Sequence, residues 1–259
     1  IVVCADPARC DVWVEDCAIA VTFIQLMAVA LDLGSCWIQV RKRDHASGCP
    51  ARDDIARHLD LPDRLAVEAM IAIGKETGML TSCSDYHIFD KLKFKSRQEC
   101  MDSYCEVVDA AFEAGVRPRC HLEDITRADI EGLVLPFVER LMRMSEQVPD
   151  DLKAKVRLCD TMGFGVSYPQ AALPRSVPKL VLALRHKAGV PSDRLEWHGH
   201  NDFHKVHVNA ATAWLYGCDA ANATLFGYGE RTGNPPLEGS VLEYIALRGD
   251  LCGVRTEVI

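Results

Sequence analysis

The sequence has 259 residues, of which 49% are hydrophobic and 25% are charged. These values are ordinary for a globular protein of one large or two small domains, and they allow a sizeable buried core. The formal net charge of −8 argues against nucleic acid or an anionic membrane surface as the main partner of the chain.

The apolar runs, the N-terminus and the cysteines indicate where in the cell such a protein would work. The longest uncharged apolar run, residues 17–31, is too short to span a bilayer, so it predicts a buried helix and no membrane partner. No signal peptide is visible, although the sequence opens on Ile1 rather than on Met. The 12 cysteines are scattered without a CxxC pair, which favours free thiols in a reducing compartment and hence a cytoplasmic protein.

The first part of the chain alternates strand and helix patterns that are separated by Gly and Pro. In chain order, the patterns predict a strand over 1–5, a helix over 12–33, a strand over 36–40, a helix over 50–60 and a strand over 66–73.

From residue 81 onward the alternation becomes regular. Strands are predicted over 81–87, 117–123, 155–160, 194–200 and 222–227. Helices are predicted between and after them, over 96–114, 129–147, 172–187, 204–216 and 237–247. A train of strand–helix units is typical of parallel α/β architecture, so the fold class is predicted to be α/β.

Polar side chains gather at the carboxyl ends of these predicted strands. They are Asp85, His87, Glu123, Asp124, Asp160, Thr161, His198, His200 and Glu230. Any one of them could be a loop residue that meets water. Five polar strand ends in succession favour a functional site, because in an α/β barrel this edge of the sheet carries the chemistry.

The sharpest motif is the pair His198 and His200. Alternate residues of a strand point to the same side, so the two imidazoles can aim at one metal ion. For an isolated pair the alternative is two hydrogen-bonded histidines at a strand end. The Gly-rich turn at 229–234 could bring the amide oxygen of Asn234, or a bound phosphate, near the same point.

Four runs in the second part carry a family resemblance. They are HLEDITRAD (121–129), RLCDTMGFG (157–165), EWHGHNDFHKVHVNAATAWLYG (196–217) and GYGERTGNPPLEG (227–239). Together they resemble the DRE-TIM metallolyase superfamily, which includes HMGL-like proteins. They are most similar to its acyl-CoA condensing branch of isopropylmalate, homocitrate and Re-citrate synthases. The run TSCSDYHIF (81–89) is closer to the Re-citrate and homocitrate synthases.

The resemblance implies an acyltransferase that joins acetyl-CoA to a 2-oxo acid on a TIM-type barrel. In that family a divalent cation (Mg²⁺, Mn²⁺ or Zn²⁺) polarises the ketone for attack by the acetyl-CoA enolate. By motif, the resemblance assigns His198, His200 and Asn234 to the metal, Arg119, His121 and Thr161 to the 2-oxo acid, and Glu123 to catalysis.

The departures from the family pattern are equally specific. The five predicted units resemble the fourth to eighth strands of an eight-stranded barrel, over residues 76–259. The Asp-Arg-Glu motif of the family's first strand does not occur in residues 1–80, and the chain ends before the family's late His. We therefore expect weak metal binding that favours Zn²⁺ and no detectable turnover. The open sheet edges predict either a homo-oligomer or docking of residues 1–75 onto an edge.

Residues 1–75 resemble the C-terminal half of a nitroreductase-like flavoprotein. The runs that carry this resemblance are IVVCADPAR (1–9), DCAIAVTFIQLMAVALDLGSCWI (16–38) and HLDLPDRLAVEAMIAIGK (58–75). The resemblance implies FMN near residues 33–36, but the family's Arg-rich segment for the FMN phosphate is absent. The predicted domains are thus a nitroreductase-like fragment, 1–75, and a partial barrel, 76–259. The junction between the two predicted domains, near residue 75, is compatible with a natural fusion, an assembly artefact or a designed chimera.

Two other functions stay open at this point. One is an FMN-dependent nitroreductase-like oxidoreductase, which a yellow colour on purification would support. The other is an inactive fused fragment that self-associates, which concentration-dependent folding would support.

Overall fold

The structure is a computed structural model that divides into two compact units, Ile1–Thr77 and Gly78–Ile259. It describes residues 1–31, 33–43, 49–74, 76–251, 253 and 255. In the described parts, strands and helices alternate as expected from the sequence, although two of the strands lie outside their predicted ranges.

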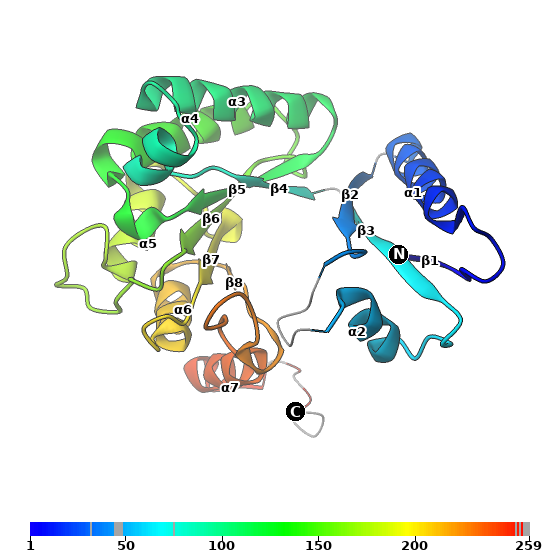
Figure 1. Ribbon diagram of the computed structural model, residues 1–259. Coiled ribbons are helices and arrows are strands. Elements are labelled where there is room, and N and C mark those ends of the chain that lie inside the picture. The colour runs from blue at the N-terminus through cyan, green and yellow to red at the C-terminus, as the bar shows by residue number, and fades with distance from the viewer. Residues whose placement is uncertain (32, 44–48, 75, 252, 254, 256–259) are drawn as a thin grey trace. The chain divides into compact units, whose positions relative to one another are not determined.

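The first unit is built on a three-stranded antiparallel sheet with the order β1-β3-β2 (Figure 1). Its elements are β1 (Val2–Ala5), α1 (Trp13–Ala30), β2 (Gly34–Gln39), α2 (Ala51–His58) and β3 (Ala66–Gly74). A small core forms where Val21 of α1 packs with Ala69 and Ile71 of β3. The predicted helix over 12–33 ends early, at Ala30, because β2 already begins at Gly34.

Helix α1 leaves much of its apolar surface exposed. The exposed fractions of Ile19, Phe23, Leu26 and Val29 lie between 55% and 72%. Among the described residues, α1 is also the helix whose length and composition would let it cross a membrane, a test that the core helix of a globular domain passes equally. An apolar surface of this kind is typical of a contact with further protein.

The second unit contains a five-stranded sheet in strict chain order, β4-β5-β6-β7-β8 (Figure 1). The strands are β4 (Glu76–Leu80), β5 (Arg117–Glu123), β6 (Lys155–Asp160), β7 (Leu195–Gly199) and β8 (Ala220–Ala221). The pairs from β5 to β8 are parallel. The chain after β4 runs the same way, because Thr81 N–H and Cys83 N–H donate to the carbonyls of His121 and Glu123. The prediction of consecutive parallel strands is confirmed.

A helix follows each of these strands. The helices are α3 (Arg97–Glu113), α4 (Leu135–Ser145), α5 (Val177–His186), α6 (Val206–Tyr216) and α7 (Leu237–Arg248). Short π-helices cover Tyr86–Lys91 and Ile130–Val134, so the predicted helix over 129–147 is split in two. Helix α3 begins after Ser96, whose hydroxyl accepts a hydrogen bond from Glu99 N–H and so caps the first turn.

The two faces of this sheet differ in polarity. Leu122, Leu158 and Trp197 are buried in the apolar core with the helices. Because side chains alternate along a strand, the neighbours of these residues in sequence, such as His121, Arg157 and His198, point to the opposite face. That inner face is therefore lined by polar and ionisable groups.

Two predicted strands are wrong. Residues 81–87 do not form one, because Ser82 and Ser84 use their hydroxyls to bind Glu123 and the His87 N–H, which starts a loop and a π-helix. The sequence over 222–227 is not a strand either. Asn222 N–H still donates to the Trp197 carbonyl of β7, but Thr224 N–H donates to the Pro235 carbonyl, so the backbone has left the sheet by Thr224.

Candidate functional site

Strand β7 brings the predicted histidine pair together. His198 Nε2 lies 3.3 Å from His200 Nε2, and the two rings are nearly perpendicular. Two nitrogens that each bind one ion at about 2.1 Å must lie within about 4 Å of one another, and this pair meets that condition. The arrangement fits two ligands of a divalent metal.

Hydrogen bonding decides how His198 presents its ring. The Nδ1 atom lies 2.7 Å from Asn222 Oδ1, an oxygen that only accepts, so Nδ1 carries the proton and Nε2 offers its lone pair. Burial lowers the pKa of His198, which keeps the imidazole neutral as a metal ligand must be. In His200 the buried Nδ1 has no partner among the described residues.

The donor set is small. No cluster of three His, Cys, Asp or Glu side chains with metal-ligand spacing occurs in the described ranges. One carboxylate, that of Glu230 on an exposed loop, has its Oε2 atom 3.9 Å from His200 Nε2. The two imidazoles therefore fit a divalent metal, but with fewer protein ligands than a closed site has.

Asn234 supports the segment between the two histidines. Its amide Nδ2 donates to the Gly199 carbonyl at 2.8 Å, and its backbone N–H donates to Gly227. The loop is tightly folded: Gly233 has a φ of +93°, and a Cβ there would lie 2.0 Å from the Gly227 oxygen. No contact of the Asn234 amide oxygen with either imidazole is recorded among the described residues, so its role as a metal ligand stays a prediction.

Glu123 lies at the carboxyl end of β5 within a polar cluster of its own. Ser82 Oγ donates to Glu123 Oε2, and His87 Nδ1 lies 3.3 Å from the same oxygen. The registers place Glu123 beside Cys159, and Cys159 beside His198. The carboxylate and the histidine pair therefore lie in one row of the sheet, two strands apart.

Thr161 follows directly after β6 and binds the neighbouring loop. Its hydroxyl oxygen accepts a hydrogen bond from Asp124 N–H at 2.8 Å. The adjacent Asp160 is buried and accepts hydrogen bonds from Thr126 Oγ1 and Gly165 N–H, while burial raises its pKa. Asp160 therefore fixes the loop that carries Thr161.

Below the edge of the sheet lies a second row, made of His121, Arg157 and Glu196. Arg157 binds Glu196 through Nε and Nη2, at 2.9 and 2.7 Å. Arg119 lies one row further down, beside Lys155, and its Nε donates to Glu196 at 3.2 Å. The structure thus places Arg119 two rows from the histidine pair and His121 one row from it.

Five residues near this site were missed in the sequence. Four of them, Ser82, Arg157, Glu196 and Asn222, were not singled out at all, and the fifth, His87, was singled out as a polar strand end but given no role. The alternation within β6 and β7 could have indicated that Arg157 and Glu196 lie on the same face as Cys159 and His198, but not that they pair with each other.

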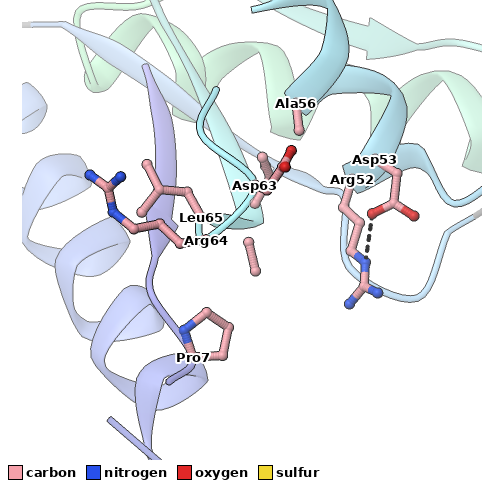
Figure 2. Close-up of a pocket in the computed structure, with 9 residues that line it drawn as sticks. Pro7, Arg52, Asp53, Ala56, Asp63, Arg64 and Leu65 are labelled. Atoms are coloured by element: carbon pink, nitrogen blue, oxygen red, sulfur yellow. Dashed lines mark hydrogen bonds and ion pairs between the residues drawn. The ribbon is translucent and has the colours of Figure 1, made fainter. Parts of the chain in front are cut away.

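The first unit offers a shallow cavity of about 220 Å³ (Figure 2). Arg52, Asp53, Asp63 and Arg64 line it, and Arg52 binds Asp53. Its volume lies below the roughly 300–1,000 Å³ usual for ligand pockets. Its two arginines are matched by two aspartates. This cavity therefore does not fit FMN. A second cavity of about 380 Å³ lies against α1 and includes Leu33, but all its lining side chains are apolar, so it offers no group for the FMN phosphate.

Comparison with known proteins gives two family matches. Residues 46–257 match the HMGL-like family, and residues 6–75 match the Nitroreductase family. A citrate (Re)-synthase from Syntrophus aciditrophicus is 59% identical over 185 residues, which cover 71% of this chain and 29% of that protein. A citrate (Re)-synthase from Clostridium kluyveri is 52% identical over 185 residues, or 71% of this chain and 40% of that protein. The chain thus spans less than half the length of these relatives.

Solved structures show the fold. The HMG-CoA lyase from Brucella melitensis aligns with a TM-score of 0.53 at 18% identity, over 71% of this chain and 62% of that chain. The predicted α/β class and the nitroreductase-like segment are both confirmed. With the family match covering most of the sequence, the chain belongs to the HMGL-like family.

Proposed function

We propose that the second unit provides the metal-binding and oxo-acid-binding part of an acyl-CoA condensing site that makes citrate from acetyl-CoA and oxaloacetate. The observation that carries the proposal is the convergence of His198 Nε2 and His200 Nε2, at 3.3 Å, at the carboxyl end of a parallel strand. The choice of oxaloacetate is supported by the names of the relatives at 59% and 52% identity.

His198 and His200 would hold the divalent metal, with Asn222 fixing the tautomer of His198. When bound, the ion supplies Lewis-acid polarisation of the ketone. Asn234, which is hydrogen-bonded to Gly199, keeps both histidines in place. These residues would bind the metal and orient its two histidine ligands.

Thr161 would contact the carboxylate next to the ketone, and Glu123 would hold a proton. The loop of Thr161 is fixed by Asp160, which gives its hydroxyl a defined position at the carboxyl edge. Glu123 Oε2 faces both Ser82 Oγ and His87 Nδ1, so a proton can be held at this oxygen and shared with either neighbour. Arg119 fits the oxo acid less well, since Glu196 already engages its Nε.

The test is release of free CoA from acetyl-CoA and oxaloacetate, followed with a thiol reagent in the presence of Mn²⁺. The 259-residue chain is expected to release no CoA, because residues 1–80 contain no Asp-Arg-Glu motif and loss of one preorganised group costs about 10²–10³ in rate. A chimera in which the family's first three barrel strands precede Glu76, and the family's segment with the late His follows the barrel, is expected to release CoA.

The control is His200→Ala in the same chimera, which should abolish the release. A chimera that folds and binds Mn²⁺ but stays inactive would contradict the proposal. Release that is unchanged in His200→Ala would contradict it as well. The oxidoreductase alternative is not proposed, because neither cavity described in the first unit combines residues 33–36 with a cationic side chain for the FMN phosphate.

A further inference from the structure

The row below the histidine pair has the composition of an anion site. The strand registers place His121 beside Arg157 and Arg157 beside Glu196. They place Glu123, Cys159 and His198 in the row above. Successive side chains on one face of a strand are about 6.6 Å apart, which is roughly the span from a ketone to the hydrogen-bond partner of a carboxylate two carbons away.

The guanidinium of Arg157 is hydrogen-bonded along one edge and accessible along the other. Its Nε and Nη2 donate to Glu196 Oε2, while Nη1 has no hydrogen-bond partner among the described residues. The side chain is 16% exposed, so it is not sealed in the core. A guanidinium has five N–H donors in a planar fork, and its second edge matches a carboxylate. Glu196 thus orients Arg157 and leaves that edge available.

The electrostatics of the row favour an anion. Burial, together with the charges of Arg157, His198 and Arg119, lowers the pKa of His121 to about 4, and Glu196 opposes this only in part. The geometry points the same way, because Arg119 and Arg157 both donate to the single carboxylate of Glu196. Lys155 lies 3.9 Å from the same carboxylate, so cations outnumber anions in this cluster although the protein as a whole is acidic. The His121 Nε2 atom is buried and has no partner within the described part of the chain.

We propose that Arg157, oriented by Glu196 and flanked by His121, binds the second carboxylate of a dicarboxylic 2-oxo acid. The inference rests on the proposed function for the position of the ketone at the histidine pair. It makes Arg157 the residue that selects an oxo acid with two carboxylates over one with a short apolar side chain. Nothing in the sequence motifs assigns this residue a role.

The test measures binding alone, with the full chain and without acetyl-CoA. Malate and lactate serve as stable hydroxy analogues of the dicarboxylic and monocarboxylic oxo acids, and calorimetry gives their affinities in the presence of Zn²⁺. We expect malate to bind at least about tenfold more tightly than lactate. Arg157→Gln should lower malate affinity by about tenfold and leave lactate affinity within about twofold.

Two further variants make the result specific. Arg143→Gln, on the exposed surface of α4, should change neither affinity. Arg157→Lys keeps a charge for Glu196 but loses the planar fork, so it should lower the preference for malate even if Arg157→Gln does not fold.

The proposal is overturned if the wild-type chain shows no preference for malate, or if the Arg157 variants that fold keep that preference. The outcome is separable from the proposed function. A malate preference that depends on Arg157 supports the site even if the CoA-release assay fails, and a working chimera without this preference refutes the site alone.

Discussion

At the scale of single residues, Asn222 is the group that turns His198 toward a metal. Its amide oxygen accepts from Nδ1 at 2.7 Å and so leaves Nε2 unprotonated. Loss of such an orienting hydrogen bond typically lowers metal affinity by about 10–100-fold. We expect Asn222→Ala to weaken Zn²⁺ binding by about tenfold in a calorimetric titration, and Mg²⁺ to bind more weakly than Zn²⁺ throughout.

The control for this titration is His58→Ala, because His58 is exposed on α2 in the other unit. It should leave Zn²⁺ affinity unchanged. Equal affinity of wild type and Asn222→Ala would mean that His198 does not bind the metal through Nε2.

His121 makes stability depend on pH. Its pKa in the folded chain is about 4, below the ordinary value of 6.5, so the unfolded chain binds this proton more readily. Stability from the neutral ring is complete above pH 6.5 and is lost as the pH falls toward about 4. We expect His121→Gln to flatten the fall in urea stability between these values. An imidazole NMR titration with a midpoint near 6.5 would contradict this.

The site could be predicted only in part from the sequence. His198 and His200 follow from alternation within a single strand, which needs no knowledge of the neighbours. Asn222, Arg157 and Glu196 become neighbours only through strand register. The register is a long-range property, set by how β6, β7 and β8 pair, and no local pattern contains it.

At the scale of elements, the outer face of the parallel sheet stabilises the second unit. Leu122 of β5 is fully buried in the helix-covered core. Leu122→Ala should therefore cost about 2–5 kcal/mol, through lost transfer energy and a cavity. Hydrogen exchange measures this loss of stability, because the amides of β5, β6 and β7 should exchange faster in the variant.

The matched control is Leu215→Ala on α6, where the side chain is 66% exposed. Its effect should stay within about 0.5 kcal/mol. Similar protection in the two variants would show that the helices do not pack on β5 as described.

Elements with one clear periodicity were predictable, and those shaped by local polar contacts were not. The ranges of β5 and β6 agree with the prediction at both ends. The predicted strand over 81–87 failed because hydroxyls of Ser82 and Ser84 compete with the sheet for partners. The predicted strand over 222–227 does not form because Thr224 N–H donates to the Pro235 carbonyl, in the loop that contains Asn234, instead of to a neighbouring strand.

At the scale of the whole molecule, exposed apolar surface predicts self-association. Helix α1 exposes large apolar side chains, among them Phe23 and Leu26, whose exposed fractions are 67% and 60%. These side chains carry no charge, so they would not repel the same surface on a second copy of the chain. We expect sedimentation velocity to show concentration-dependent association that Phe23→Glu weakens. Val107→Glu, at an exposed position of α3, is the control. A monomer at all concentrations would contradict this prediction.

The central claim is that His198 and His200 converge on one metal ion, and X-ray absorption of the Zn²⁺-loaded chain tests it most directly. The fine structure should contain two imidazole ligands at about 2.0–2.1 Å, and His200→Ala should retain one. A shell of sulfur ligands from the cysteines, or a spectrum that His198→Ala and His200→Ala leave unchanged, would contradict the account.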